Sequence, residues 1–137
     1  MSSEQDNWES IIEYSLIWNV EPGKTDEFKQ LVAEAVETAR RESPVTEYKW
    51  YFNDDMTRCG LIERYPDSEA LLAHLMIVGN LLSRMLAISK ISRFDVLGKL
   101  QGKAREDVEK MGARIYLPFK GFRRDETGPA KDTLSGN

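Results

Sequence analysis

The chain has 137 residues, of which 41% are hydrophobic and 31% are charged, with a formal net charge of −4. This length suits one domain that buries its own core without disulfides or a structural metal. The acidic balance argues against nucleic acid as the main partner, because phosphate binding requires a concentrated basic surface.

The scarcity of cysteine and histidine limits the chemistry that the chain can support. Cys59 and His74 are the only residues of their kinds, so an intrachain disulfide and a zinc site with several cysteine ligands are excluded. No metal site is predicted. The first ten residues, "MSSEQDNWES", are too polar for a signal peptide, and the apolar stretch "LLAHLMIVGNLLSRMLAI" is interrupted too often for a membrane span. We therefore expect a cytoplasmic protein with no membrane partner.

The first half of the chain predicts a flexible arm, a strand and a helix. Residues 1–9 form the arm. Residues 11–20 alternate, with β-branched and aromatic side chains at every second position, which is typical of a strand. Residues 24–43 repeat apolar side chains at the three-four spacing of a helix with one buried stripe, and Ser43-Pro44 ends that helix.

The second half predicts a β-hairpin, a long helix and three shorter elements. Residues 46–53 and 58–65 are the hairpin strands, and Asp67 caps a helix that runs to about Ser89. The three shorter elements are a strand at 91–102, a helix at 104–111 and a strand at 113–119. Residues 121–137 are polar and predicted to be disordered, so residues 10–120 form the predicted domain.

The order of these elements predicts the fold class. The succession β-α-β-β-α-β is that of a ferredoxin-like α+β sandwich, in which two helices cover one face of an antiparallel sheet. A short helix and a C-terminal strand are added. Both faces of the predicted strands carry apolar side chains, so the second face needs a cover. A homodimer through this sheet face is the expected solution.

The stretch "ERYPDSEALLAHL" resembles the antibiotic biosynthesis monooxygenase family. The resemblance extends over roughly residues 10 to 100 and includes the hairpin "EYKWYFNDDMTRCGLIERY". In the stretch itself it rests on an acid and an aromatic residue at the end of the third strand, followed by the start of the second helix: Glu63, Tyr65, Asp67, Glu69, Ala70, Leu71 and His74.

The resemblance implies a dimeric α/β barrel, a homodimer in which the segment 112–119 ("GARIYLPF") supplies a strand that reaches toward the partner. It also implies a monooxygenase that oxidises a small aromatic or quinol-type substrate with O₂, without metal, flavin or haem. In such a site the protein orients an acidic phenol or anthrone, stabilises its carbanion or enolate, and excludes water. A non-catalytic dimeric domain, which binds a small ligand or none, is the alternative.

A related haem-degrading branch of this fold does not match, because its asparagine, tryptophan and histidine align with Leu16, His74 and Arg84. Haem degradation is therefore not expected, and the family resemblance implies no cofactor. Six residues are candidates for the substrate site. The predicted catalytic residues are His74, Tyr51 and Asn19. The predicted substrate-binding residues are Trp50, Tyr65 and Glu63. Packing in the core is the competing interpretation for the tryptophans, and a surface ion pair is the competing interpretation for Glu63.

Overall fold

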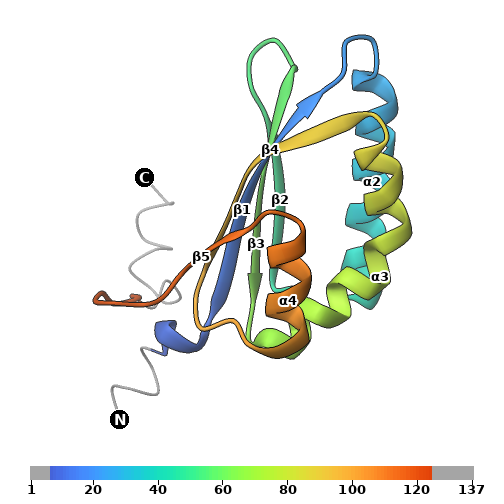
Figure 1. The fold of residues 1–137 in the computed structure, drawn as a ribbon. Coiled ribbons are helices and arrows are strands. Elements are labelled where there is room, and N and C mark those ends of the chain that lie inside the picture. The colour runs from blue at the N-terminus through green and yellow to red at the C-terminus, as the bar shows by residue number, and fades with distance from the viewer. Residues whose placement is uncertain (1–6, 125–137) are drawn as a thin grey trace, which may run out of the picture.

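A computed structural model gives the fold of the chain and describes residues 7–124 (Figure 1). The elements follow in the order η1 (Trp8–Ser10), β1 (Ile12–Val20), α2 (Thr25–Glu42), β2 (Glu47–Phe52), β3 (Arg58–Tyr65), α3 (Ser68–Leu86), β4 (Ser89–Leu97), α4 (Gly102–Lys110) and β5 (Arg114–Tyr116). The predicted arm lies outside the described residues up to residue 6, and its last part contributes to η1. The predicted disordered tail lies outside them from residue 125 onward.

The strands form one five-stranded sheet in the order β2-β3-β1-β4-β5. Strand β1 pairs antiparallel with β3 and β4, and β2 pairs antiparallel with β3. The helices lie on one side of this sheet (Figure 1). The ferredoxin-like α+β fold predicted from the sequence is therefore confirmed for the single chain.

The C-terminal strand is shorter than expected. Strand β5 spans Arg114–Tyr116 and pairs parallel with β4 of its own chain, with Val96 beside Ile115. Strand β4 also ends earlier than predicted, at Leu97. The reason is Gly98, which has a φ of +141°, and where a Cβ would lie 2.9 Å from the backbone oxygen of Ile11. Only glycine fits this conformation and this close approach, so the chain turns here.

The alternation along β1 decides which side chains enter the core. One face of the strand is buried beneath the helices and carries Ile12, Tyr14, Leu16, Trp18 and Val20. Helix α2 contributes a buried stripe from the other side, which consists of Phe28, Leu31, Ala35 and Ala39. The opposite face of β1 is half-buried or exposed, since no helix covers it.

Helix α3 begins as the sequence predicts. The side chain of Asp67 accepts a hydrogen bond from the backbone N–H of Ala70 at 2.8 Å, which is an N-cap. The helix runs unbroken through Gly79 and ends at Leu86. By length and composition alone it could cross a membrane, a test that core helices also pass. In this fold it packs one face on the sheet.

Candidate functional site

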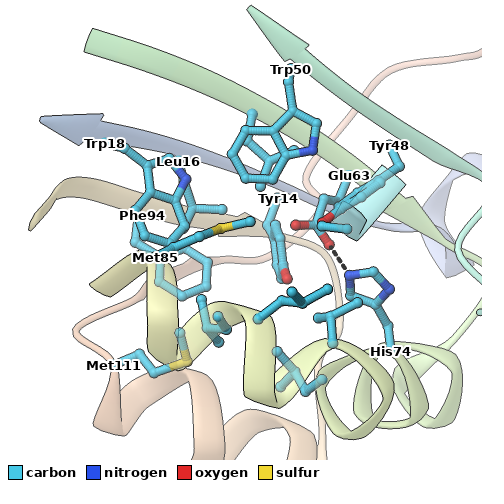
Figure 2. A pocket seen from close by; sticks show the side chains of 16 residues that line it. Tyr14, Leu16, Trp18, Tyr48, Trp50, Glu63, His74, Met85, Phe94 and Met111 are labelled. Atoms are coloured by element: carbon cyan, nitrogen blue, oxygen red, sulfur yellow. Dashed lines mark ion pairs between the residues drawn. The ribbon is translucent and has the colours of Figure 1, made fainter. Parts of the chain in front are cut away.

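The interior between the sheet and helices α2 and α3 contains an aromatic-lined pocket (Figure 2). Its aromatic walls come from β1, β2 and β4 and consist of Tyr14, Trp18, Tyr48, Trp50 and Phe94. Helix α3 closes it with aliphatic side chains, and its polar groups are Glu63 and His74. The space open to water is about 20 Å³, which is room for about one water molecule.

Sheet register places Glu63 between two tyrosines. In β3, Glu63 lies opposite Tyr14 of β1 on one side and opposite Tyr48 of β2 on the other. Residues directly opposite each other in a sheet share a face. The three side chains therefore form a row on the inner face, and α3 covers this row.

Burial controls the ionisation of Glu63. Its side chain is 3% exposed, and desolvation raises the pKa of the carboxyl group to about 8. Hydrogen bonds from the hydroxyls of Tyr65 and Tyr14 favour the carboxylate and partly oppose this shift. Burial also raises the pKa of both tyrosines well above its usual value. The tyrosines therefore remain hydrogen-bond donors, while Glu63 titrates near neutral pH.

His74 enters the pocket from α3 and contacts two polar groups. Its Nε2 lies 3.4 Å from Oε1 of Glu63 (dashed line in Figure 2), and its Nδ1 lies 2.7 Å from Oγ of Ser43. The ring also packs edge-on against Tyr48 and Tyr65. Burial lowers the pKa of His74 to about 4, so the ring is neutral at pH 7. One ring nitrogen then donates a hydrogen bond and the other accepts one.

Two further donors in the pocket lack partners. Among the described residues, the indole N–H groups of Trp18 and Trp50 are buried and make no hydrogen bond. Buried polar groups are usually paired, because an unsatisfied donor costs about 1–3 kcal/mol. Both indoles line the pocket. They are therefore available to an oxygen atom of a bound molecule.

The structure brings together four of the six predicted site residues and separates the other two from them. Glu63, His74 and Trp50 line the pocket, and Tyr65 holds the carboxylate of Glu63. Tyr51, which is 55% exposed, and Asn19 lie on the opposite face of the sheet. Successive side chains of a strand point to opposite faces, so neither residue can reach the pocket through a rotamer change.

The sequence analysis did not name Tyr14, which lines the pocket, or Ser43, which contacts His74. Tyr14 shares the buried face of β1 with Trp18, so the alternation contained a signal for it. Ser43 carried no such signal, since its contact with His74 joins residues 31 positions apart in the chain. Within residues 7–124, no group of three potential metal-ligating side chains converges on a common point.

Fold and pocket together define a ferredoxin-like α+β domain with a buried glutamate and a histidine in an aromatic pocket. The model of the antibiotic biosynthesis monooxygenase family matches residues 16–76. This region begins within β1 and contains α2, the β2–β3 hairpin and His74. The resemblance inferred from the stretch between Glu63 and Leu75 is therefore confirmed.

Solved structures share the fold over most of this chain. MupZ from Pseudomonas fluorescens is 22% identical over 87% of this chain and 98% of its own, with a TM-score of 0.75. Rv0793 from Mycobacterium tuberculosis is 20% identical over 69% of this chain and 99% of its own, with a TM-score of 0.57. SnoaB from Streptomyces nogalater, a cofactor-independent oxygenase, is 15% identical over 69% of this chain and 97% of its own, also with a TM-score of 0.57. No curated protein sequence matches the chain.

Proposed function

We propose that the protein is a cofactor-independent monooxygenase that oxidises a small aromatic or quinol-type substrate with O₂. The observation that carries this proposal is the carboxyl group of Glu63, buried in an aromatic pocket beside His74. The family match over residues 16–76 supports the same class of reaction, and SnoaB is an oxygenase with a similar fold.

Glu63 is the proposed general base. Its pKa of about 8 lies closer to that of a phenol, which is about 10, than the pKa of an ordinary glutamate does. In the proposed reaction the carboxylate removes a proton from an anthrone-type substrate, and the resulting carbanion transfers electrons to O₂. A C–O bond forms, and the peroxide anion takes the proton back from Glu63 to give a hydroperoxide, which loses water and leaves a carbonyl group. Substrate and O₂ are thus converted to a quinone and water.

The indoles of Trp18 and Trp50 are the proposed orienting groups. Their unpartnered N–H donors suit the phenolate or enolate oxygen that gains charge when the substrate loses its proton. A donor fixed in a dry pocket stabilises such charge more strongly than water does. The surrounding rings supply the flat apolar surface that an aromatic substrate needs.

The small free volume favours a second candidate function. Sites for small molecules usually have about 300 Å³ or more, whereas the space open to water here is about 20 Å³. An aromatic substrate therefore requires Leu75, Leu82 or Met111, which are half-buried at the pocket wall, to move aside. A non-catalytic domain that binds a small ligand, or none, has no such requirement.

We further propose a cytoplasmic homodimer that forms through the uncovered sheet face. Ile17 of β1 and Tyr51 of β2 both lie opposite Gly60 on this face, and Ile62 lies two residues further along β3 on the same face. The side chain of Tyr51 is exposed. Phe119 and Leu117, after β5, are also largely exposed. A second copy of the chain on this sheet would cover the apolar side chains that the single chain leaves open to water.

Oxygen uptake tests the proposed oxidation. The protein is incubated with a panel of hydroquinones and anthrones in air and under anaerobic conditions, alongside the variants Glu63→Gln and Glu13→Gln. Glu13 is the matched control, because it lies on the uncovered face of β1. We expect oxygen consumption by the parent and Glu13→Gln and almost none by Glu63→Gln. A parent that consumes no oxygen with any substrate supports the non-catalytic domain instead.

A further inference from the structure

Ser43 lies at the end of α2 and contacts His74. It is the C-cap residue of this helix and is half-buried, whereas Glu63 and His74 are 3% and 1% exposed. Its hydroxyl oxygen lies 2.7 Å from Nδ1 of His74 and accepts a hydrogen bond from the backbone N–H of Val45 at 3.1 Å. The hydroxyl is thus held in place between the imidazole and the surface.

Three groups therefore form a continuous polar chain from the pocket outward. The carboxylate of Glu63 contacts Nε2 of His74 at 3.4 Å, and Nδ1 contacts Ser43. The hydrogen-bond partners of Glu63, Tyr14 and Tyr65, are themselves buried. Among the hydrogen bonds and the ion-pair contact described for Glu63, only the contact with His74 continues to a hydroxyl that meets solvent.

We propose that His74 and Ser43 form a proton path that connects the carboxyl group of Glu63 with solvent at the end of α2. The inference rests on the proposed function in that it gives Glu63, the proposed base, a route to exchange its proton while substrate fills the pocket. His74 and Ser43 act through Glu63, and Ser43 is a positioning and relay residue rather than a catalytic one.

One proton moves from Glu63 to water, and His74 and Ser43 each gain one proton and lose one. Protonated Glu63 gives its proton to Nε2, the hydrogen on Nδ1 passes to Oγ of Ser43, and the hydroxyl hydrogen of Ser43 passes to water. The imidazole changes tautomer without rotating, and the carboxylate of Glu63 is left free. The reverse steps return a proton to Glu63 and restore the first tautomer.

The other titratable groups around the path do not compete with it. Tyr48 of β2 and Tyr65 of β3 face the imidazole, and Tyr14 of β1 faces the carboxyl group. Burial raises the pKa of all three phenols well above its usual value. Each keeps its proton near neutral pH, so proton exchange is confined to Glu63, His74 and Ser43.

The single histidine makes a direct test possible. In protein labelled with ¹⁵N-histidine, one imidazole gives the signals, and the rate at which its N–H hydrogen exchanges with water is measured by NMR. We expect exchange to be at least about tenfold slower in Ser43→Ala, because the variant lacks the hydroxyl that links Nδ1 to water. Ser43→Thr, which keeps a hydroxyl, should restore the parent rate. Ser83→Ala, an exposed position on α3, is the control and should leave the rate unchanged.

Unchanged exchange in Ser43→Ala, or exchange as slow in Ser43→Thr as in Ser43→Ala, would overturn the proton path. If Ser43→Ala does not fold, Ser43→Cys replaces it with the same expectation, because a thiol is a weak hydrogen-bond partner. The experiment uses no substrate. If exchange is slower in Ser43→Ala and the parent consumes no oxygen, the path is supported and the monooxygenase is contradicted. If exchange is unchanged in Ser43→Ala and the parent consumes oxygen, the monooxygenase is supported and the path is contradicted.

Discussion

Nε2 of His74 lies 3.4 Å from the carboxylate of Glu63, in the interior of the protein. This contact joins the second turn of α3 to the end of β3, and each side chain is almost completely removed from water. Burial favours the neutral form of both groups. The pair is therefore a buried acid and base that share a proton near neutral pH, rather than a permanent ion pair.

The pair predicts how stability depends on pH. Glu63 has a folded pKa of about 8, raised above its ordinary value of 4.5, so its contribution to stability is lost as the pH rises toward 8. His74 has a folded pKa of about 4, lowered from 6.5, so its contribution grows between pH 4 and 6.5. The two nearly cancel below pH 6.5. Above it we expect the free energy of unfolding to fall by about 2 kcal/mol by pH 8.

Urea unfolding between pH 5 and 9 measures this dependence. Glu63→Gln has no carboxyl group to ionise, so its free energy of unfolding should stay level between pH 6.5 and 8. The control Glu13→Gln should decline as the parent does. Parallel curves for the parent and Glu63→Gln would show that Glu63 does not titrate in this range.

The rate of oxidation should show the opposite trend with pH. The proposed base acts as the carboxylate, so the rate should increase through about pH 8 as Glu63 loses its proton. Initial rates of oxygen uptake from pH 6 to 9 give this profile, with the spontaneous oxidation of the substrate subtracted at each pH. A rate that falls across this range would assign Glu63 the role of an acid.

Replacement of His74 separates a role in chemistry from a role in packing. In His74→Ala we expect oxidation to slow by about tenfold or more, and the free energy of unfolding to fall by about 2–4 kcal/mol because a buried ring is removed. Oligomeric state should not change, since His74 points from α3 toward the covered face of the sheet and not toward the uncovered one. If the parent oxidises no substrate and the dimer of His74→Ala dissociates, His74 is a packing residue.

Removal of one indole N–H tests the orienting donors. Trp50→Phe keeps an aromatic ring and loses the donor, so kcat/KM should fall by about fivefold to tenfold, as expected for one hydrogen bond. Trp8→Phe is the matched control, because Trp8 lies in η1 and does not line this pocket. Equal kinetics for Trp50→Phe and the parent would restrict Trp50 to packing.

A charge on the uncovered sheet face tests the homodimer. Ile62→Lys places an ammonium group at the centre of this face, where burial by a second copy would be costly. We expect it to sediment as a monomer while the parent sediments as a dimer. Met76→Lys is the control, because Met76 is 77% exposed on α3, away from this face. Dissociation by Met76→Lys alone would locate the interface on the helix.

The sequence by itself determined the elements and the fold. Alternation in residues 11–20, the three-four stripe in residues 24–43 and the cap at Asp67 are local patterns, and each was sufficient because the interactions that stabilise it lie within a few residues. The stretch from Glu63 to Leu75 also carried the family resemblance. Alternation along residues 46–53 also places Tyr51 and Trp50 on opposite faces of their strand. It does not tell which of the two faces the helices cover.

Only the tertiary structure decided the site. The helices cover the face of Tyr14 and Trp50, which leaves Tyr51 and Asn19 on the other side. Ser43 meets His74 because α2 ends beside α3. The carboxyl group of Glu63 titrates near pH 8 because α3 removes it from water. Desolvation and contacts between distant segments exist only once the chain is packed, so the stretch "ERYPDSEALLAHL" contains Glu63 and His74 but does not set their chemistry.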